Sequence, residues 1–413
     1  MPGFATLCLV WYFILGGLGL FFPFYSLYLR ENVGLSGAQT GMVMAIPPLL
    51  GIFVQPFWGQ IADRSGSRTR VLALLALGAS IGYTALLVPH SFAGFVVGTA
   101  ALAIFGVALI PTAVSASLAL LQTSGGRAFG RARVFGTLGF AVSVGGFPLL
   151  LNRIQARAPP TGSLASTAEP YLELIFPLAG GMLLLGGLLA LMLPKTGTVA
   201  LRAKRGDWRE LLHHGPFLRL LVVTFFAFLF LQGPMALFPI LVRGLGGGID
   251  SLSRMWLVML AIEIPLVTFV GASVARLGLR GVIATGVAAG ALRWLVSGFA
   301  DSLLVVTLIQ FLHGVVVWGV ILGTPLYVDA VVPDRLRSTG QGLLAMIGVS
   351  IGGLLSNVCA GWLIDQLGPR APAQVGGCGA LLLLGLLFWI LPTLPNRDPS
   401  TEPTLTSPAR STT

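Results

Sequence analysis

The sequence predicts an all-α membrane protein with twelve transmembrane helices arranged as two pseudo-symmetric halves of six. The first observation is that 55% of its 413 residues are hydrophobic. The second is that only 9% are charged, against roughly 25% in a soluble domain. The third is that the apolar residues gather in segments long enough to span a bilayer, about 20 residues each. A soluble core could not bury this much apolar surface, so lipid must surround most of the chain.

Polar and turn-rich breaks divide the chain into twelve apolar segments. The first has no Lys or Arg before it and no A-x-A-like site after it. We therefore interpret it as a span and not as a cleaved signal peptide. The expected spans are 5–29, 38–61, 71–89, 93–120, 131–151, 172–193, 216–242, 252–275, 281–300, 303–331, 339–366 and 373–393.

Basic residues set the expected orientation, because loops rich in Lys and Arg stay cytoplasmic. The loops that follow even-numbered spans hold most of these residues. We therefore expect both termini to be cytoplasmic in a bacterial-type inner membrane. The expected cytoplasmic residues are Arg64, Arg68, Arg70, Arg127, Arg131, Lys195, Arg202, Lys204, Arg205, Arg209, Arg276, Arg280, Arg335 and Arg337.

The longest basic polar stretch, 194–215, divides the spans six and six. We expect an N-terminal half at 1–193, a cytoplasmic linker at 194–215 and a C-terminal half at 216–395. The tail at 396–413 is rich in Ser, Thr and Pro, which is typical of disorder.

Composition and motifs exclude several classes of function. The net charge of +11 is spread over many short segments, whereas a nucleic-acid-binding face needs a clustered stripe. Cys8, Cys359 and Cys378 lie in apolar segments and indicate neither disulfides nor a metal site. No nucleotide loop, metal-ligand spacing or nucleophile–base set is present. We therefore expect neither an enzyme nor a bound cofactor.

The stretch "GQIADRSGSRTR", 59–70, follows the second span. It places Asp63 at the inner end of a helix, followed by Arg64, a turn at Gly66 and further arginines. A carboxylate beside arginines can form charge-assisted hydrogen bonds that latch helices together in one state and release them in another. The alternative is an ordinary basic loop with an incidental acid.

Three ionisable residues fall inside consecutive spans of the second half: Glu263, Arg293 and His313. Such residues are costly in lipid and usually mark a pathway or a partner. Counted from the outer ends at 1.5 Å per residue, the three positions lie within roughly 6 Å of one depth. They can meet only if their helices turn these faces toward a common cavity.

The chemistry of these three groups is suited to moving a proton. A buried carboxyl group tends to keep its proton, whereas a nearby guanidinium favours the ionised form. Histidine exchanges a proton close to physiological pH. Glu263 could therefore carry a proton if its access to Arg293 or His313 changes. The alternative is a static ion pair that pins three helices.

The fifth span begins with "FGRARVFGTLGFAVS", 129–143. We expect Arg131 to lie at the membrane surface as an anchor. Arg133 is nearer the bilayer and could turn inward. Gly136 and Gly139 would let a neighbouring helix pack closely beside it.

The first span contains "GLFFPFYSLYL", 19–29. Pro23 should kink the helix. The kink would re-aim an aromatic patch that includes Phe24, Tyr25 and Tyr28. Substrate contact and an interfacial aromatic belt are equally good interpretations of this patch.

Taken together, these motifs resemble one branch of the major facilitator superfamily. The Asp63 loop looks like the superfamily's G-x-L-A-D-R-x-G-R-[KR] loop. "FFPFYSLYL", "GRARVFG", "RSTGQGL" and the order Glu263, Arg293 ("RW") and His313 ("QFLHG") resemble the lactose permease, nucleoside–proton symporters and the phenylpropionate permease. The resemblance implies the major facilitator fold and alternating access.

The resemblance also implies roles for individual residues. Arg133 and Glu263 would contribute to substrate binding. Arg293 and His313 would belong to a proton-coupling network with Glu263. Asp63 and Arg64 would gate access without touching the substrate.

Two departures from the lactose permease are informative. Its span-four Glu is replaced here by Ser115, and its Glu three residues after the His is replaced by Val316. Galactoside recognition is therefore in doubt, and proton carriage shifts toward Glu263 and His313. With no acid near it in span four, Arg133 could meet an anionic substrate, which is closer to the phenylpropionate-permease pattern.

The expected function is proton-coupled uptake of a small organic solute, with sugar, nucleoside and aromatic acid all open. The expected partners are that solute, protons and the lipid bilayer, with no nucleic acid, and we expect a monomer. The first alternative is an efflux antiporter, but "GGFP", 145–148, lacks the Gly-Pro pair common in the fifth span of antiporters. The second is a membrane sensor, for which the loops and tail are too short to supply an output domain.

Overall fold

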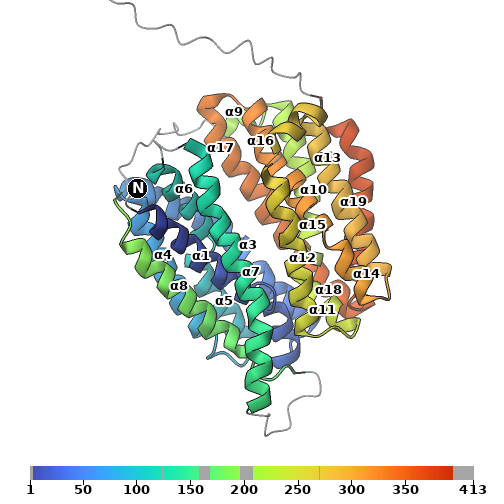
Figure 1. Ribbon diagram of the computed structural model, residues 1–413. Helices are drawn as coiled ribbons and strands as arrows, with labels where there is room; N and C mark the ends of the chain where they lie inside the picture. Colours follow the sequence, from blue (N-terminus) through green and yellow to red (C-terminus); the bar gives the residue numbers. More distant parts are fainter. Residues whose placement is uncertain (1–2, 122–124, 158–167, 196–207, 269, 394–413) are drawn as a thin grey trace, which may run out of the picture.

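The computed structural model describes residues 3–121, 125–157, 168–195, 208–268 and 270–393, and the regular structure in these ranges is helical (Figure 1). Most of the predicted linker and the whole predicted tail at 396–413 lie outside these ranges. The helices gather in two groups, α1–α8 and α10–α19, that stand side by side (Figure 1).

The N-terminal group contains one helical unit for each of the six predicted spans. The two spans at 5–29 and 93–120 are each divided into shorter helices. The elements are α1 Phe4–Phe21, α2 Tyr25–Leu27, η1 Tyr28–Asn32, α3 Gly37–Arg64, α4 Arg68–Ala85, α5 Phe92–Gly106, α6 Leu109–Leu120, α7 Gly125–Arg157, η2 Leu172–Leu174 and α8 Ile175–Leu191.

The C-terminal group follows a short helix, α9 Trp208–Leu211, in the linker. Spans ten and eleven contain π-helical turns, η3 and η5, within otherwise α-helical segments. The elements are α10 Gly215–Ala236, α11 Phe238–Gly244, α12 Ile249–Thr268, α13 Val270–Phe299, α14 Leu303–Ile309, α15 Leu312–Val316, η3 Val317–Leu322, α16 Gly323–Val331, η4 Asp334–Leu336, α17 Arg337–Leu343, η5 Leu344–Ile351, α18 Gly352–Leu367 and α19 Ala371–Ile390.

Ten helical stretches in the described ranges are long and apolar enough to cross a membrane. The remaining two predicted spans correspond to α4 and α12, which carry more charge. Two arginines begin α4, and α12 contains Asp250, Arg254 and Glu263. Both helices nevertheless pack within the bundle, α4 against α8 and α12 against α7.

The predicted kink at Pro23 is confirmed, because α1 ends at Phe21 and helical structure resumes at Tyr25. Proline has no N–H to donate, so the helical hydrogen-bond ladder is interrupted at this point. The interruption lies immediately before the aromatic residues Phe24, Tyr25 and Tyr28.

Glycines allow close approach of helices, as the sequence predicts for Gly139. A Cβ on Gly139 would overlap the backbone of Tyr12 in α1, and one on Gly348 would overlap the side chain of Thr224 in α10. The same device joins the two halves, because Gly41 in α3 lies against Gly361 in α18. Small residues supply this packing where lipid gives helices no hydrophobic drive to associate.

The two halves meet most closely at one end of the bundle. We call this end, where Asn32, Ser36 and Leu367 lie, the far end. The opposite end, where Phe4, Arg64 and α9 lie, is called the linker end. The ribbons of the two halves spread apart toward the linker end (Figure 1).

Replacing Gly139 by Ala should lower stability, because the added methyl overlaps the Tyr12 backbone. Overpacking of this kind costs about 1–3 kcal/mol. The measurement is the thermal unfolding midpoint of detergent-purified protein. Gly181→Ala is the matched control, since a Cβ there meets nothing within 4 Å. Equal midpoints for the two variants would contradict the packing argument.

Candidate substrate and coupling site

Arg133 and Glu263 form an electrostatic couple across the two halves. Arg133 lies on α7 and Glu263 on α12, two helices that pack together. Each charge acts on the other. The Glu263 side chain makes no hydrogen bond to a described residue, and Arg133 is the charged group that acts on it there.

The Arg133 side chain is held by aromatic packing. Its guanidinium lies over the Trp11 ring, 4.9 Å from the ring centroid. The Trp11 indole is itself fixed, because its Nε1 donates to Ser117 Oγ at 2.9 Å. A cation over an aromatic face is stabilised by the ring quadrupole, which leaves the N–H groups free for other partners. Arg131 instead is exposed and lies over Phe4, as expected for a surface anchor.

Arg293 is almost fully buried, at 2% exposure, and makes no ion pair with a described carboxylate. Its Nε donates to Gln310 Oε1 at 2.8 Å, and its guanidinium lies over the Trp294 ring at 4.2 Å. The sulfurs of Met235 and Met259 accept from its NH2 group. Neutral and polarisable groups therefore hold this charge.

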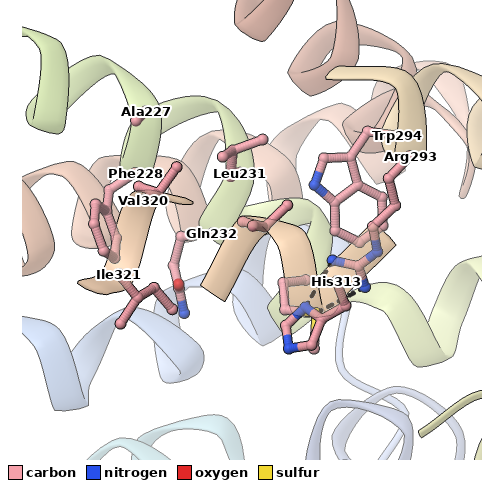
Figure 2. Close-up of a pocket in the computed structure, with 11 residues that line it drawn as sticks. Ala227, Phe228, Leu231, Gln232, Arg293, Trp294, His313, Val320 and Ile321 are labelled. Carbon is pink, nitrogen blue, oxygen red and sulfur yellow. Dashed lines mark hydrogen bonds between the residues drawn. The ribbon is translucent and has the colours of Figure 1, made fainter. Parts of the chain in front are cut away.

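His313 accepts a hydrogen bond from Arg293. The distance between Arg293 NH1 and His313 Nδ1 is 3.1 Å (Figure 2). A guanidinium can only donate, so Nδ1 must be the acceptor. The ring is then the neutral tautomer that carries its hydrogen on Nε2. The Nε2–H group of His313 can therefore donate a hydrogen bond on the side of the ring opposite Arg293.

The structure brings together two of the three ionisable residues that the sequence places at one depth. Arg293 and His313 are hydrogen-bonded, whereas the Glu263 carboxylate is coupled to Arg133. The backbone of Glu263 is nonetheless adjacent to α15, because a Cβ on Gly314 would lie 2.8 Å from the Glu263 nitrogen. Glu263 thus sits on a helix in direct contact with the His313 segment.

A small cavity of about 50 Å³ adjoins the Arg293–His313 pair (Figure 2). Its walls are mainly apolar. Besides Arg293 and His313, the polar side chain that lines it is Gln232 of α10. The other lining residues are Ala227, Phe228, Leu231, Met235, Trp294, Val316, Val320 and Ile321.

A larger cavity of about 240 Å³ lies between the halves and is lined from α1, α2, α3, α4, α5, α10 and α18. We call it the ring cavity because aromatic rings form much of its wall. Tyr25 lines it and hydrogen-bonds Thr99 at 2.6 Å between the two hydroxyl oxygens. Phe21 stacks on Tyr25 and meets Tyr83 edge-on, with centroid distances of 4.2 and 4.7 Å.

The other two aromatic residues proposed from the sequence lie elsewhere. Phe24 is fully buried against Phe147, with ring centroids 5.0 Å apart. Tyr28 packs edge-on against Phe176 and Phe95. Neither residue lines the ring cavity.

Sequence reasoning missed the amides of this region. Gln232 lines both cavities, and Asn357 lines the ring cavity. Both lie in the apolar runs of expected spans. A search of the expected spans for amide side chains, like the search for ionisable ones, would have found both residues. An uncharged polar group in lipid also needs a partner.

Asp63 and Arg64 are exposed at the linker end. Asp63, near the end of α3, pairs with Arg68 at the start of α4, at 2.9 Å. In this conformation the Asp63 carboxylate is therefore bound within its own half, and the predicted gating contact with the other half stays a prediction.

The far end is held by ionic contacts between the halves that the sequence did not reveal. Arg243 of α11 reaches Glu31 at 2.9 Å and Glu169 at 2.8 Å. Asp365 of α18 accepts from the backbone nitrogens of Gly37 and Ala38 at 2.6 and 2.7 Å, which caps the N-terminus of α3. We call these contacts the far-end latch.

The arrangement suits binding and proton exchange better than bond chemistry. No group of three or more His, Cys, Asp or Glu side chains in the described ranges could hold a metal ion. What the site offers is one carboxylate, two guanidinium groups and a neutral imidazole among apolar walls.

The family model described as "MFS_1 like family" matches residues 4–373. The chain belongs to this family. The maltose permease of Geobacillus stearothermophilus is 30% identical over 361 residues, which is 87% of each chain. The uncharacterized transporter YwbF of Bacillus subtilis is 26% identical over 391 residues, or 94% of each chain. The putative nucleoside transporter YegT of Escherichia coli is 27% identical over 374 residues, covering 84% of this chain and 81% of the relative.

Solved structures show the same fold at low identity. The nucleoside transporter NupG superposes with a TM-score of 0.76 at 14% identity, over 94% of this chain and 99% of NupG. A D-xylose–proton symporter has a TM-score of 0.68 at 13% identity, over 94% and 98% of the two chains. The predicted major facilitator fold is confirmed, and the chain is a multi-pass membrane transporter of that superfamily.

Removing the far-end latch should loosen the far end. Arg243→Ala deletes the ion pairs to Glu31 and Glu169, so the population with a separated far end should grow. The measurement is the distance distribution between spin labels at His90→Cys and Leu304→Cys, with the three native cysteines replaced by Ala.

The matched control for the latch is Arg370→Ala, because Arg370 pairs with Asp301 within the C-terminal half. This control should leave the distances unchanged. The latch is not what closes the far end if Arg243→Ala and Arg370→Ala give the same distribution as the parent.

Proposed function

We propose that the protein couples uptake of a small uncharged organic solute to the inward movement of protons, in an inner membrane with both termini cytoplasmic. The observation that carries the proposal is the Arg133–Glu263 couple. One carboxylate in the middle of the C-terminal half is set against a cation of the N-terminal half. A change in its protonation therefore alters the attraction between the two halves.

The transport cycle follows from this electrostatics. With Glu263 ionised, the charge of Arg133 stabilises the carboxylate. Protonation removes this attraction and turns the carboxyl group into a hydrogen-bond donor. A solute that occupies the space between the halves can then bond to both side chains. Return to a state in which Arg133 again acts on Glu263 favours release of the proton.

The Arg293–His313 pair gives Glu263 a second electrostatic environment. Arg293 has no carboxylate partner among the described residues, and buried charges are normally paired. Glu263 lies on the helix that contacts the His313 segment. We propose that the carboxylate moves between Arg133 and this pair during the cycle, which assigns proton coupling to Glu263, Arg293 and His313.

We propose that the substrate is a sugar or a nucleoside and not an aromatic acid. The relatives include a maltose permease and a putative nucleoside transporter. The charge of Glu263 acts on Arg133, so an anionic solute beside Arg133 would also meet the repulsion of that carboxylate. Asp63 and Arg64 would act at the linker end as gating residues, with the two halves moving as units and the protein acting as a monomer.

Replacing Glu263 by Gln should abolish solute accumulation driven by a pH gradient. Exchange of solute without a gradient should persist, because the amide can still donate a hydrogen bond. The measurement is uptake into proteoliposomes with and without a protonophore, using maltose and uridine. Glu210→Gln, an exposed linker residue, is the control. Full gradient-driven accumulation by the Glu263 variant would rule out this mechanism.

Replacing Arg133 by Gln should weaken solute binding about tenfold or more, the effect of losing a charged hydrogen bond worth about 1.5–3 kcal/mol. Binding is measured by isothermal titration with the transported solute. Arg131→Gln should bind like the parent, because Arg131 is exposed at the surface. Equal affinities for both variants would remove Arg133 from the binding site.

A further inference from the structure

The ring cavity is separate from the ionic groups of the coupling site. None of the described residues that line it carries a charge, and neither Arg133 nor Glu263 is among them. Both halves contribute to its wall, with Gln232 and Asn357 coming from the C-terminal half. A molecule in this cavity would touch both halves without meeting a charge.

Two adjacent prolines in α3 determine the polar character of one wall. Pro47 and Pro48 have no N–H to donate to the carbonyls four residues earlier, those of Val43 and Met44. Val43, Met44 and both prolines line the ring cavity. The helix therefore presents backbone acceptors on this face that a regular helix would have satisfied internally.

Asn357 satisfies one of these acceptors and is fixed by doing so. Its Nδ2 donates to the Met44 carbonyl at 2.8 Å, across the interface between the halves. Because a carbonyl can only accept, this bond assigns the amide orientation and leaves Oδ1 as the remaining acceptor. That oxygen has no hydrogen-bond partner among the described residues, although Asn357 is 2% exposed.

Two further polar groups on the wall have no hydrogen-bond partner among the described residues. These are the Gln232 amide and the Tyr83 hydroxyl. The Tyr25 hydroxyl is committed to Thr99. The remaining lining is aromatic and aliphatic, with Phe21, Phe22 and Met44 prominent. The wall thus combines stacking surfaces with unused neutral hydrogen-bonding groups.

We propose that the ring cavity is a substrate subsite for an uncharged ring bearing O–H or N–H donors, and that Asn357 Oδ1 accepts from one of them. The proposal rests on the proposed function, since it assigns part of the same transported solute. An ionised substituent is excluded from this subsite because no charged group there would compensate its desolvation. Gln232 lines both the subsite and the small cavity beside Arg293 and His313.

The test is ligand binding by the full-length protein in nanodiscs. The probes are two uncharged ring compounds, uridine and 4-nitrophenyl α-D-glucoside, and one acid, 3-phenylpropionate. At least one uncharged probe should bind to the parent, and Asn357→Leu and Gln232→Leu should each weaken it about tenfold, the effect of a lost hydrogen bond. Gln374→Leu is the matched control, since Gln374 bonds to Gly298 outside the cavity.

A second variant keeps the test decisive if Asn357→Leu does not fold. Ala103→Phe places a ring in the cavity from α5 while leaving the Asn357–Met44 bond intact. It should abolish binding of the uncharged probe. Binding of 3-phenylpropionate alone, binding of no probe by the parent, or parental affinity in Ala103→Phe would overturn the subsite.

The same proteins separate this inference from the proposed function. If a pH gradient drives the probe into proteoliposomes but Asn357→Leu and Ala103→Phe bind it as the parent does, the subsite is wrong and the transport mechanism stands. If the variants lose binding but no gradient drives uptake by the parent, the subsite stands and the proton coupling fails.

Discussion

Charge buried between two helical halves is the constraint on which the rest of this structure depends. In a low-dielectric interior an ionised group needs compensation, and the chain supplies it differently at each site. Glu263 is partly compensated by the charge of Arg133 from the opposite half. Arg293 is compensated by neutral groups, namely Gln310, His313 and the Trp294 face. One charge therefore depends on how the halves are placed, and the other does not.

This difference suits a protein whose halves must move. A cation held by aromatic and sulfur contacts within one half keeps its surroundings when that half rotates. A carboxylate whose partner lies across the interface loses or gains that partner. Glycine contacts hold the halves together at one end. Gly41 packs closely against Gly361 at the far end, where Arg243 adds ion pairs. The ribbons of the two halves spread apart at the opposite end, which suits a conformation that is open there (Figure 1).

Much of the fold followed from the sequence because lipid imposes simple rules. A span needs a run of apolar residues, and its backbone must bond internally, so the segment lengths and the break at Pro23 were predictable. Two spans, α4 and α12, carry enough charge to fall outside a strict hydropathy test, and α12 is the helix that bears Glu263. The breaks within spans four and ten were not predicted, since local apolar composition says little about where a helix bends.

The sequence by itself determined that the chain spans a membrane many times and which ionisable residues enter the bilayer, because composition and spacing fix both. It also indicated the superfamily, through the Asp63 loop and the order of Glu263, Arg293 and His313. Only the tertiary structure decided which of these charges meet. Glu263 is coupled to Arg133 and not to Arg293, and Asn357 bonds to a carbonyl that Pro48 leaves free. Such partnerships depend on the rotation of each helix about its axis and on the packing of the two halves, and residue spacing along one helix does not encode either.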